Sequence, residues 1–147
     1  MELKPLLIAN ARLLGGEAGS LLVAGGRIAA LNPSDTPEGT DTVDAKGQWL
    51  APGIIDFGVF ATDKPAFHFG GITRAALMPD SGPLDGAGPV ERAAKGGKPD
   101  LWVHPIAAAT KGLAGAELAE IGLMQRAGAV AFGDGARTIS NAQVMRR

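Results

Sequence analysis

The chain has 147 residues, 46% hydrophobic and 20% charged, which are the values of an ordinary globular protein of about one domain. A net charge of -1 gives no field that would draw it to nucleic acid or to an anionic membrane, and no apolar run approaches the roughly 20 residues that span a bilayer. The absence of cysteine excludes disulfides and thiolate metal sites and fits a cytoplasmic location.

Residues 1–52 are predicted to form a small antiparallel β unit. The apolar run 6–14 predicts a strand, and the segment 20–31 contains two apolar runs around Gly25 and Gly26. Two residues that tolerate positive φ between apolar runs indicate a hairpin. A polar loop follows over 32–41, and the next residues add a short strand and a turn.

From residue 53 the pattern changes to strands that alternate with helices. The predicted strands cover 53–60, 71–79, 101–110 and 129–132, and the predicted helices cover 86–100 and 115–128. In the second helix Leu118, Ile121 and Met124 fall on one side. Alternation of this kind predicts βαβ units and a parallel sheet.

The end of the chain predicts one more helix. Ser140 and Gln143 have the spacing of a capping box, and the sequence stops a few residues later. Because helices that short are marginal in water, and because a (β/α)8 barrel takes about 250 residues, we expect the chain to be an N-terminal fragment of a longer protein.

Several segments resemble known enzymes. "GRIAAL" and "DAKGQWLAPGIID" resemble the N-terminal region of the amidohydrolase superfamily. "GGITRAALMPDSGP" and "HPIAAATKGLAGAELAEIGLMQRAGAVAF" resemble dihydroorotases, which interconvert carbamoyl aspartate and dihydroorotate in pyrimidine biosynthesis. The resemblance implies an α/β fold in which residues 1–52 are the N-terminal part of a small β-sandwich. Residues 53–147 are then the first four βα units of a TIM (β/α)8 barrel.

The resemblance implies that the metal motif of the first barrel strand is lost. In the family this strand ends Asp-x-His-x-His, and alternate residues of a strand point the same way, so both histidines reach the metal at the barrel mouth. Here Asp56 is retained, but Gly58 and Phe60 hold the histidine positions. Neither side chain has a donor atom for a metal.

Substrate-binding positions are altered as well. The family's Leu-Arg-Glu-Pro-Gly, whose arginine binds the substrate carboxylate, is absent from "ATDKPAFHF", and the short interval predicts that the first barrel helix is lost or reduced. The family's Met-Pro-Asn-Thr becomes Met78-Pro79-Asp80-Ser81. Asp80 in place of the asparagine would repel the substrate carboxylate.

A single acidic residue follows the fourth strand, where relatives have Ser-Asp-Asp-Gly with a metal ligand. Asp134 is either that ligand or a turn aspartate bonded to its own backbone, and the loss of both histidines favours the turn. Three other polar residues could be a metal ligand or a substrate contact, but each has a simpler interpretation. His68 is then a loop residue, His104 a packing residue in its strand, and Lys111 a solvated charge in a loop.

Two functional hypotheses follow. The first is a catalytically silent dihydroorotase homologue without a cofactor, acting as a structural partner of the catalytic chain of aspartate carbamoyltransferase. The second is an active zinc-dependent dihydroorotase or cyclic amidohydrolase whose metal set uses Asp134 and histidines from later strands. A truncated product without function is a third alternative.

Overall fold

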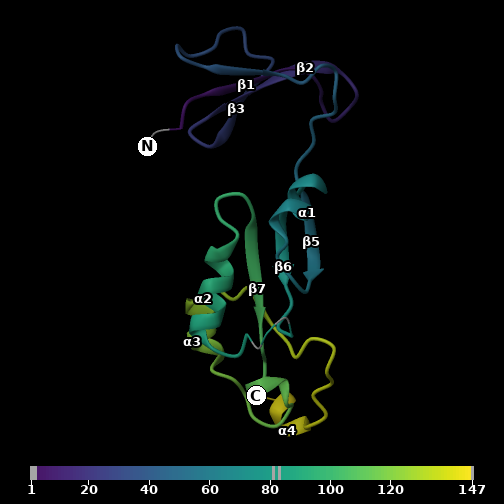
Figure 1. Cartoon of the computed structure of the whole chain (residues 1–147), viewed down its shortest axis with the longest axis vertical. Coiled ribbons are helices and arrows are strands. Elements are labelled where there is room, and N and C mark those ends of the chain that lie inside the picture. The colour runs from purple at the N-terminus through teal and green to yellow at the C-terminus, as the bar shows by residue number, and fades with distance from the viewer. Residues whose placement is uncertain (1–2, 81, 83, 147) are drawn as a thin grey trace. The chain divides into compact units, whose positions relative to one another are not determined.

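The computed structural model describes residues 3–80, 82 and 84–146. Ser81, the last residue of the altered Met-Pro-Asn-Thr segment, lies outside the described residues. The chain divides into two compact units, Met1–Pro52 and Gly53–Arg147 (Figure 1). Each unit has its own sheet, and each is described by itself.

Unit 1 is a four-stranded sheet with the strand order β3-β2-β1-β4. Its strands are β1 (Leu6–Arg12), β2 (Ala18–Ala24), β3 (Arg27–Leu31) and β4 (Asp41–Asp44). The first three pair antiparallel, but β4 pairs parallel to β1, so the prediction of an all-antiparallel unit is wrong at this strand. The loop after β3 returns the chain to the start of β1, where the amide of Asp41 donates to the carbonyl of Pro5 at 2.9 Å.

The predicted hairpin is confirmed between β2 and β3. Gly25 and Gly26 form its turn with φ of 58° and 72°, in the left-handed region at both central residues. Such a turn matches the twist of the two flanking strands, and glycine adopts it without a Cβ penalty. The dipeptide therefore sets the direction in which β3 leaves β2.

Unit 2 is built on a curled parallel sheet with the strand order β5-β6-β7-β8, as in one half of a (β/α)8 barrel. The strands are β5 (Ile54–Val59), β6 (Ile72–Leu77), β7 (Trp102–Ala107) and β8 (Ala131–Phe132). The helices are α1 (Lys64–Phe69), α2 (Ala87–Gly96), the 3-10 turn η1 (Lys111–Leu113), α3 (Ile121–Arg126) and α4 (Ala142–Met145). No helix among the described residues is long and apolar enough to cross a membrane. The predicted parallel sheet is confirmed.

The helices differ from prediction in their ends. The first barrel helix is reduced, as expected, to the six residues of α1. The helix predicted over 115–128 begins only at Ile121, because Leu118 instead forms an antiparallel bridge with Thr110. At α4 the cap is Asn141 and not Ser140, since the Asn141 side chain accepts from the amide of Gln143 at 2.9 Å.

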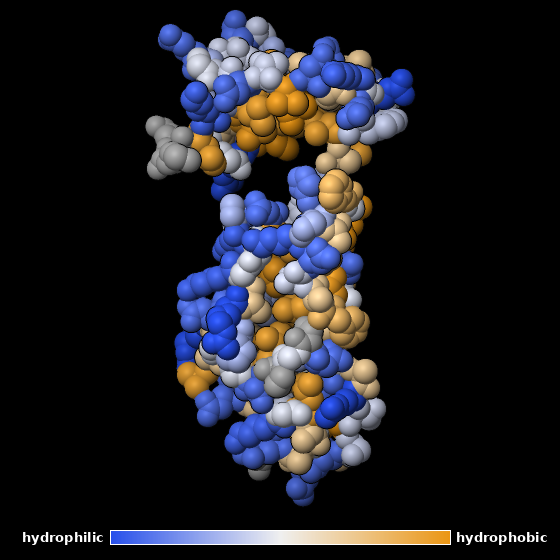
Figure 2. All heavy atoms as spheres, viewed as in Figure 1, coloured by the Kyte–Doolittle hydropathy of each residue, from blue (hydrophilic) through white to orange (hydrophobic). Residues whose placement is uncertain are grey.

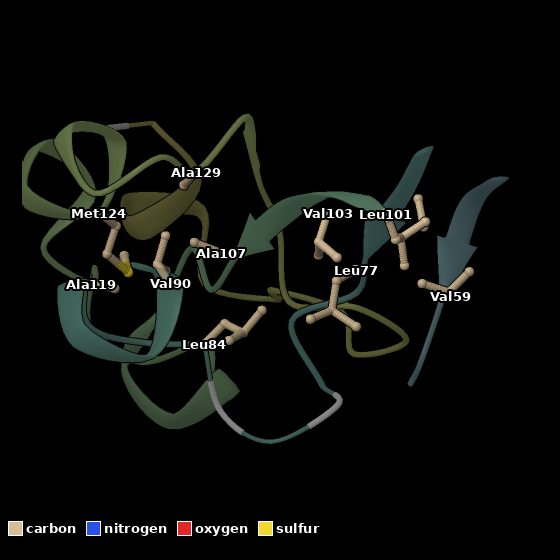
Figure 3. Packing of buried hydrophobic residues seen from close by; sticks show 11 residues of the cluster. Val59, Leu77, Leu84, Val90, Leu101, Val103, Ala107, Ala119, Met124 and Ala129 are labelled. Carbon is tan, nitrogen blue, oxygen red and sulfur yellow. The ribbon is translucent and has the colours of Figure 1, made fainter. Parts of the chain in front are cut away.

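The core of unit 2 lies where α2 packs against β7 and α3 packs against α2 (Figure 3). Val90 of α2 and Met124 of α3 are both 0% exposed. They pack with apolar residues of the strands and loops, namely Val59, Ala75, Leu77, Leu84, Leu101, Val103, Ala107, Ala119 and Ala129. This packing buries Ala75 and Leu77 of β6 and Val103 and Ala107 of β7.

Met124→Ala should lower the free energy of unfolding by about 2–5 kcal/mol, because the site is fully enclosed and the cavity left behind cannot fill with water. Leu123→Ala on the same helix is the matched control: Leu123 is 45% exposed, and the change should stay within about 1 kcal/mol. Urea unfolding of both variants measures the two values. Equal losses would show that α3 is not docked as described.

Candidate functional site

The carboxyl ends of the four parallel strands form one edge of unit 2, and the predicted site residues follow these ends. Backbone contacts hold the edge together. The amide of Met78 donates to the carbonyl of Val59 at 2.8 Å, and the amide of Ala109 donates to the carbonyl of Gly133 at 3.3 Å. The loops after β6 and β8 also meet, because a Cβ placed on Gly135 would lie 2.7 Å from the carboxyl carbon of Asp80.

The end of β5 offers no metal ligand at the two histidine positions. Gly58 has no side chain, and a Cβ built there would meet nothing within 4 Å, so the glycine is not imposed by crowding. Phe60 lies just beyond the strand and is 60% exposed. Asp56 is half-buried, and its carboxylate accepts from the amide of Gly58 at 3.0 Å. The only acidic side chain of β5 is therefore engaged with its own strand.

The register of β5 is irregular at this point. Asp56 pairs with Ala75 and Val59 pairs with Leu77, so three residues of β5 advance against two of β6. Such a bulge breaks simple alternation of side chains between the two faces. The assumption that positions 58 and 60 follow Asp56 on one face is therefore not supported by the pairing of this strand.

Asp134 is the most completely engaged side chain at this edge. It is 4% exposed, and its Oδ1 accepts from the backbone amides of Ala109 at 3.1 Å and Thr110 at 2.9 Å. Its Oδ2 accepts a short hydrogen bond from the Thr110 hydroxyl, whose oxygen in turn accepts from the amide of Gly115 at 2.8 Å. We refer to Asp134, Thr110 and these amides as the β7–β8 clamp.

The clamp joins the segment after β8 to the segment after β7. Sequence reasoning favoured a turn aspartate bonded to its own backbone, whereas the bonded amides lie 24 and 25 positions earlier in the chain. Thr110, which is 0% exposed, was not singled out from the sequence; the signal was a threonine directly after an apolar strand. No buried side-chain nitrogen or oxygen in the described part of the chain lacks a partner, so the clamp is satisfied without an ion.

The other candidate residues are Asp80, His68 and Lys111, and each has its own surroundings. Asp80 is exposed and lies against Gly135 at the edge. His68, in the last turn of α1, contacts the ring of Phe69 and lines a small hollow with residues that begin β6, at the opposite end of the strands. Lys111 pairs with Glu117 at 2.5 Å, and this hydrogen bond and the charge of Glu117 raise the pKa of Lys111 above its ordinary value.

His104 lies in the middle of β7, away from both ends of the strand. Its Nε2 is 3.2 Å from a guanidinium nitrogen of Arg74 on β6. Arginine can only donate, so Nε2 is the acceptor in this contact.

The described residues at this edge do not by themselves make up a zinc site. Catalytic zinc usually takes three protein ligands from histidine and carboxylate side chains. Within residues 3–80, 82 and 84–146, no group of three or more such side chains comes together. Asp134 has both oxygens in hydrogen bonds, and the histidine positions hold Gly58 and Phe60.

Unit 2 has the fold of part of an α/β barrel. The chain superposes on a crystal structure of a dihydroorotase with a TM-score of 0.56 and 13% identity, over 88% of this chain and 42% of that one. At this identity the likeness concerns the fold alone. No protein-family model matches the chain.

By sequence, the chain is a homologue of dihydroorotases. It is 34% identical over 165 residues to the dihydroorotase of Solibacter usitatus (strain Ellin6076), across 97% of this chain and 38% of the relative. It is 35% identical over 162 residues to that of Pelotomaculum thermopropionicum, again across 97% of this chain and 38% of the relative. The chain thus spans just over a third of the length of these curated relatives.

Proposed function

We propose that the chain is the N-terminal part of a longer dihydroorotase-family protein that has lost dihydroorotase activity, needs no metal, and serves as a structural partner of the catalytic chain of aspartate carbamoyltransferase. The observation that carries the proposal is the pattern of change. The sequence match to dihydroorotases extends over 97% of the chain and the barrel strands are formed, whereas Gly58, Phe60 and Asp80 stand at positions that contact metal or substrate in the family.

The state of Asp134 supports loss of the metal. A carboxylate that holds two amides and a hydroxyl has to give up these hydrogen bonds before it can coordinate an ion, and each buried donor left behind is costly. The active alternative, with zinc bound by Asp134 and histidines of later strands, requires that exchange. The assay described in the Discussion separates the two.

We extend the proposal to the fold of unit 1, as one layer of a small β-sandwich. One side of its sheet carries an open apolar hollow of about 770 Å³, and Figure 2 shows apolar side chains gathered there. Leu14, Ile28 and Leu31 line the hollow and are 72%, 66% and 61% exposed. An apolar face of this kind is stable when a second layer covers it. We place the protein in the cytoplasm, in keeping with its lack of cysteine.

The partner proposal predicts a change in size. The full-length protein mixed with aspartate carbamoyltransferase should elute from a size-exclusion column earlier than either protein alone, because a structural partner forms a stable complex. An active dihydroorotase of a relative serves as the comparison protein. If the elution profile of the mixture is only the sum of the two separate profiles, the protein is not a structural partner of aspartate carbamoyltransferase. That result would not bear on the loss of activity, which has its own assay.

A further inference from the structure

Arg74 of β6 lies on the face of the parallel sheet that the helices do not cover. The residues that follow Arg74 and its register partner Trp102 are Ala75 and Val103, which belong to the helix-covered core and are 0% and 5% exposed. Successive residues of a strand point to opposite faces, so the side chains of Arg74 and Trp102 lie on the other face. In a (β/α)8 barrel the helices are outside, and this other face is the barrel interior.

The contacts of Arg74 within the described part of the chain involve no carboxylate. Its guanidinium carbon lies 5.2 Å from the centre of the Trp102 ring, and one of its nitrogens lies 3.2 Å from Nε2 of His104. The ion pairs among the described residues involve Lys64, Lys95 and Lys111. Arg74 therefore brings a full positive charge to the interior, with most of its five N–H donors unused.

A closed barrel surrounds that charge with side chains. Barrel interiors are packed in layers and are not open pores. A guanidinium buried there without a counter-charge is strongly unfavourable. A carboxylate placed opposite forms a charge-assisted, bidentate pair with the planar group and leaves its stacking on Trp102 intact.

The strands of unit 2 do not supply this carboxylate. The side chains that cross-strand pairing and alternation place around Arg74 are those of Ile55, Trp102, His104, Ile106 and Ala131, and none of these is acidic. Asp56, the acidic residue of β5, pairs in register with Ala75, and its carboxylate accepts from the amide of Gly58.

The layered packing of a barrel narrows the source further. The four side chains of one layer come from alternate strands. Since β6 is the second strand of the barrel, the layer of Arg74 is completed by the fourth, sixth and eighth strands. The fourth strand is β8, which pairs Ala131 with Ile106 and brings no charge. The sixth and eighth strands follow residue 147 in the longer protein.

We infer that the second half of the barrel places an aspartate or glutamate of its sixth or eighth strand against Arg74, and that this buried ion pair joins the two halves. The inference rests on the part of the proposed function that makes this chain the beginning of a longer barrel protein. It does not depend on the loss of activity or on the aspartate carbamoyltransferase proposal.

The first test is thermal unfolding of the full-length protein, followed by circular dichroism. Arg74→Met removes the charge at similar side-chain length and leaves the carboxylate unpaired, so the melting temperature should fall by about 10 °C. Arg74→Lys should lose less, because it keeps the charge and loses only the bidentate geometry. Arg92→Met is the matched control: Arg92 is exposed on α2, and the change should stay within about 2 °C.

A double-mutant cycle identifies the partner. Each aspartate or glutamate at an inward position of the sixth and eighth strands is changed to its amide, alone and together with Arg74→Met. One amide variant should be destabilised alone, yet recover at least about half of the loss when combined with Arg74→Met, because it removes the stranded charge. If Arg74→Met does not fold, the cycle is run with Arg74→Lys, where that amide change should cost less than it does in the parent protein.

An Arg74→Met protein as stable as the Arg92→Met control would overturn the inference. A complete barrel in which no acidic residue of the sixth or eighth strand couples to Arg74 would also overturn it, while leaving the proposed function in place. A full-length sequence without further βα units would overturn the proposed function and the inference with it, so the two failures are distinguishable.

Discussion

A full-length protein that carries Gly58, Phe60 and Asp80 should show no measurable hydrolysis of dihydroorotate at neutral pH. Metal-dependent hydrolysis relies on a bound ion that lowers the pKa of water from about 15.7 to about 7. Without that shift the hydroxide available at pH 7 falls by roughly eight orders of magnitude, or about 11–12 kcal/mol at about 1.4 kcal/mol per pKa unit. The described residues at the strand ends supply no set of ligands to hold the ion.

Restoration of the two histidines should not rescue turnover. In the Gly58→His/Phe60→His variant, Asp80 still repels the substrate carboxylate, and the family's arginine remains absent. The bulge between Asp56 and Val59 also disturbs the alternation that would aim both imidazoles at one ion.

The measurement is metal analysis together with a dihydroorotate turnover assay, with the dihydroorotase of a curated relative as the positive control. Stoichiometric zinc with turnover near the roughly 10 per second of a median enzyme would show that the protein is an active hydrolase.

Asp134→Ala should lower the free energy of unfolding by about 3 kcal/mol, because it strands the buried amide of Thr110, the half-buried amide of Ala109 and the Thr110 hydroxyl at once. Asp134→Asn should lower it less, since an amide oxygen can still accept from Ala109 and Thr110 while the charge is lost. Denaturant unfolding of both variants measures the difference.

Asp100→Ala is the matched control for this prediction. Asp100 is an exposed carboxylate 3.7 Å from Lys64, and exposed pairs contribute about 0–1 kcal/mol. An Asp134→Ala variant as stable as the parent chain, combined with loss of bound zinc, would mean that Asp134 is a ligand and that the clamp is not its role.

The parts of the fold that follow from local rules could be predicted from the sequence. The hairpin at Gly25 and Gly26 rests on backbone freedom, and the parallel sheet rests on the alternation of strand and helix patterns. The segment 115–120 could not be predicted, because Leu118 and Ile121 have helical spacing while tertiary contacts decide the outcome. The amide of Lys111 donates to the carbonyl of Glu117, and their side chains pair, which holds that segment as a loop.

The candidate site, too, could be predicted only in part from the sequence. Residue types at strand ends indicate where Gly58, Phe60 and Asp80 fall, because strand order places these ends on one edge. The partners of Asp134 could not be found in this way, since two of them are backbone amides far along the chain and amides carry no signature in the sequence. The pairing of Arg74 with Trp102 depends on cross-strand register, which the pattern of a single strand does not encode.

The free edges of the two sheets differ in how readily a foreign strand could add to them and start aggregation. In unit 1 the edge strand β4 is four residues long and has Asp41 and Asp44 at its ends, and short, charged edges resist intermolecular pairing. In unit 2 the edge strand β5 carries Ile54, Ile55 and Phe57, which are 56%, 51% and 79% exposed. Of the edge strands β4 and β5, β5 is therefore the one at which misassembly is expected to begin, and Phe57→Lys is a change suited to suppress it.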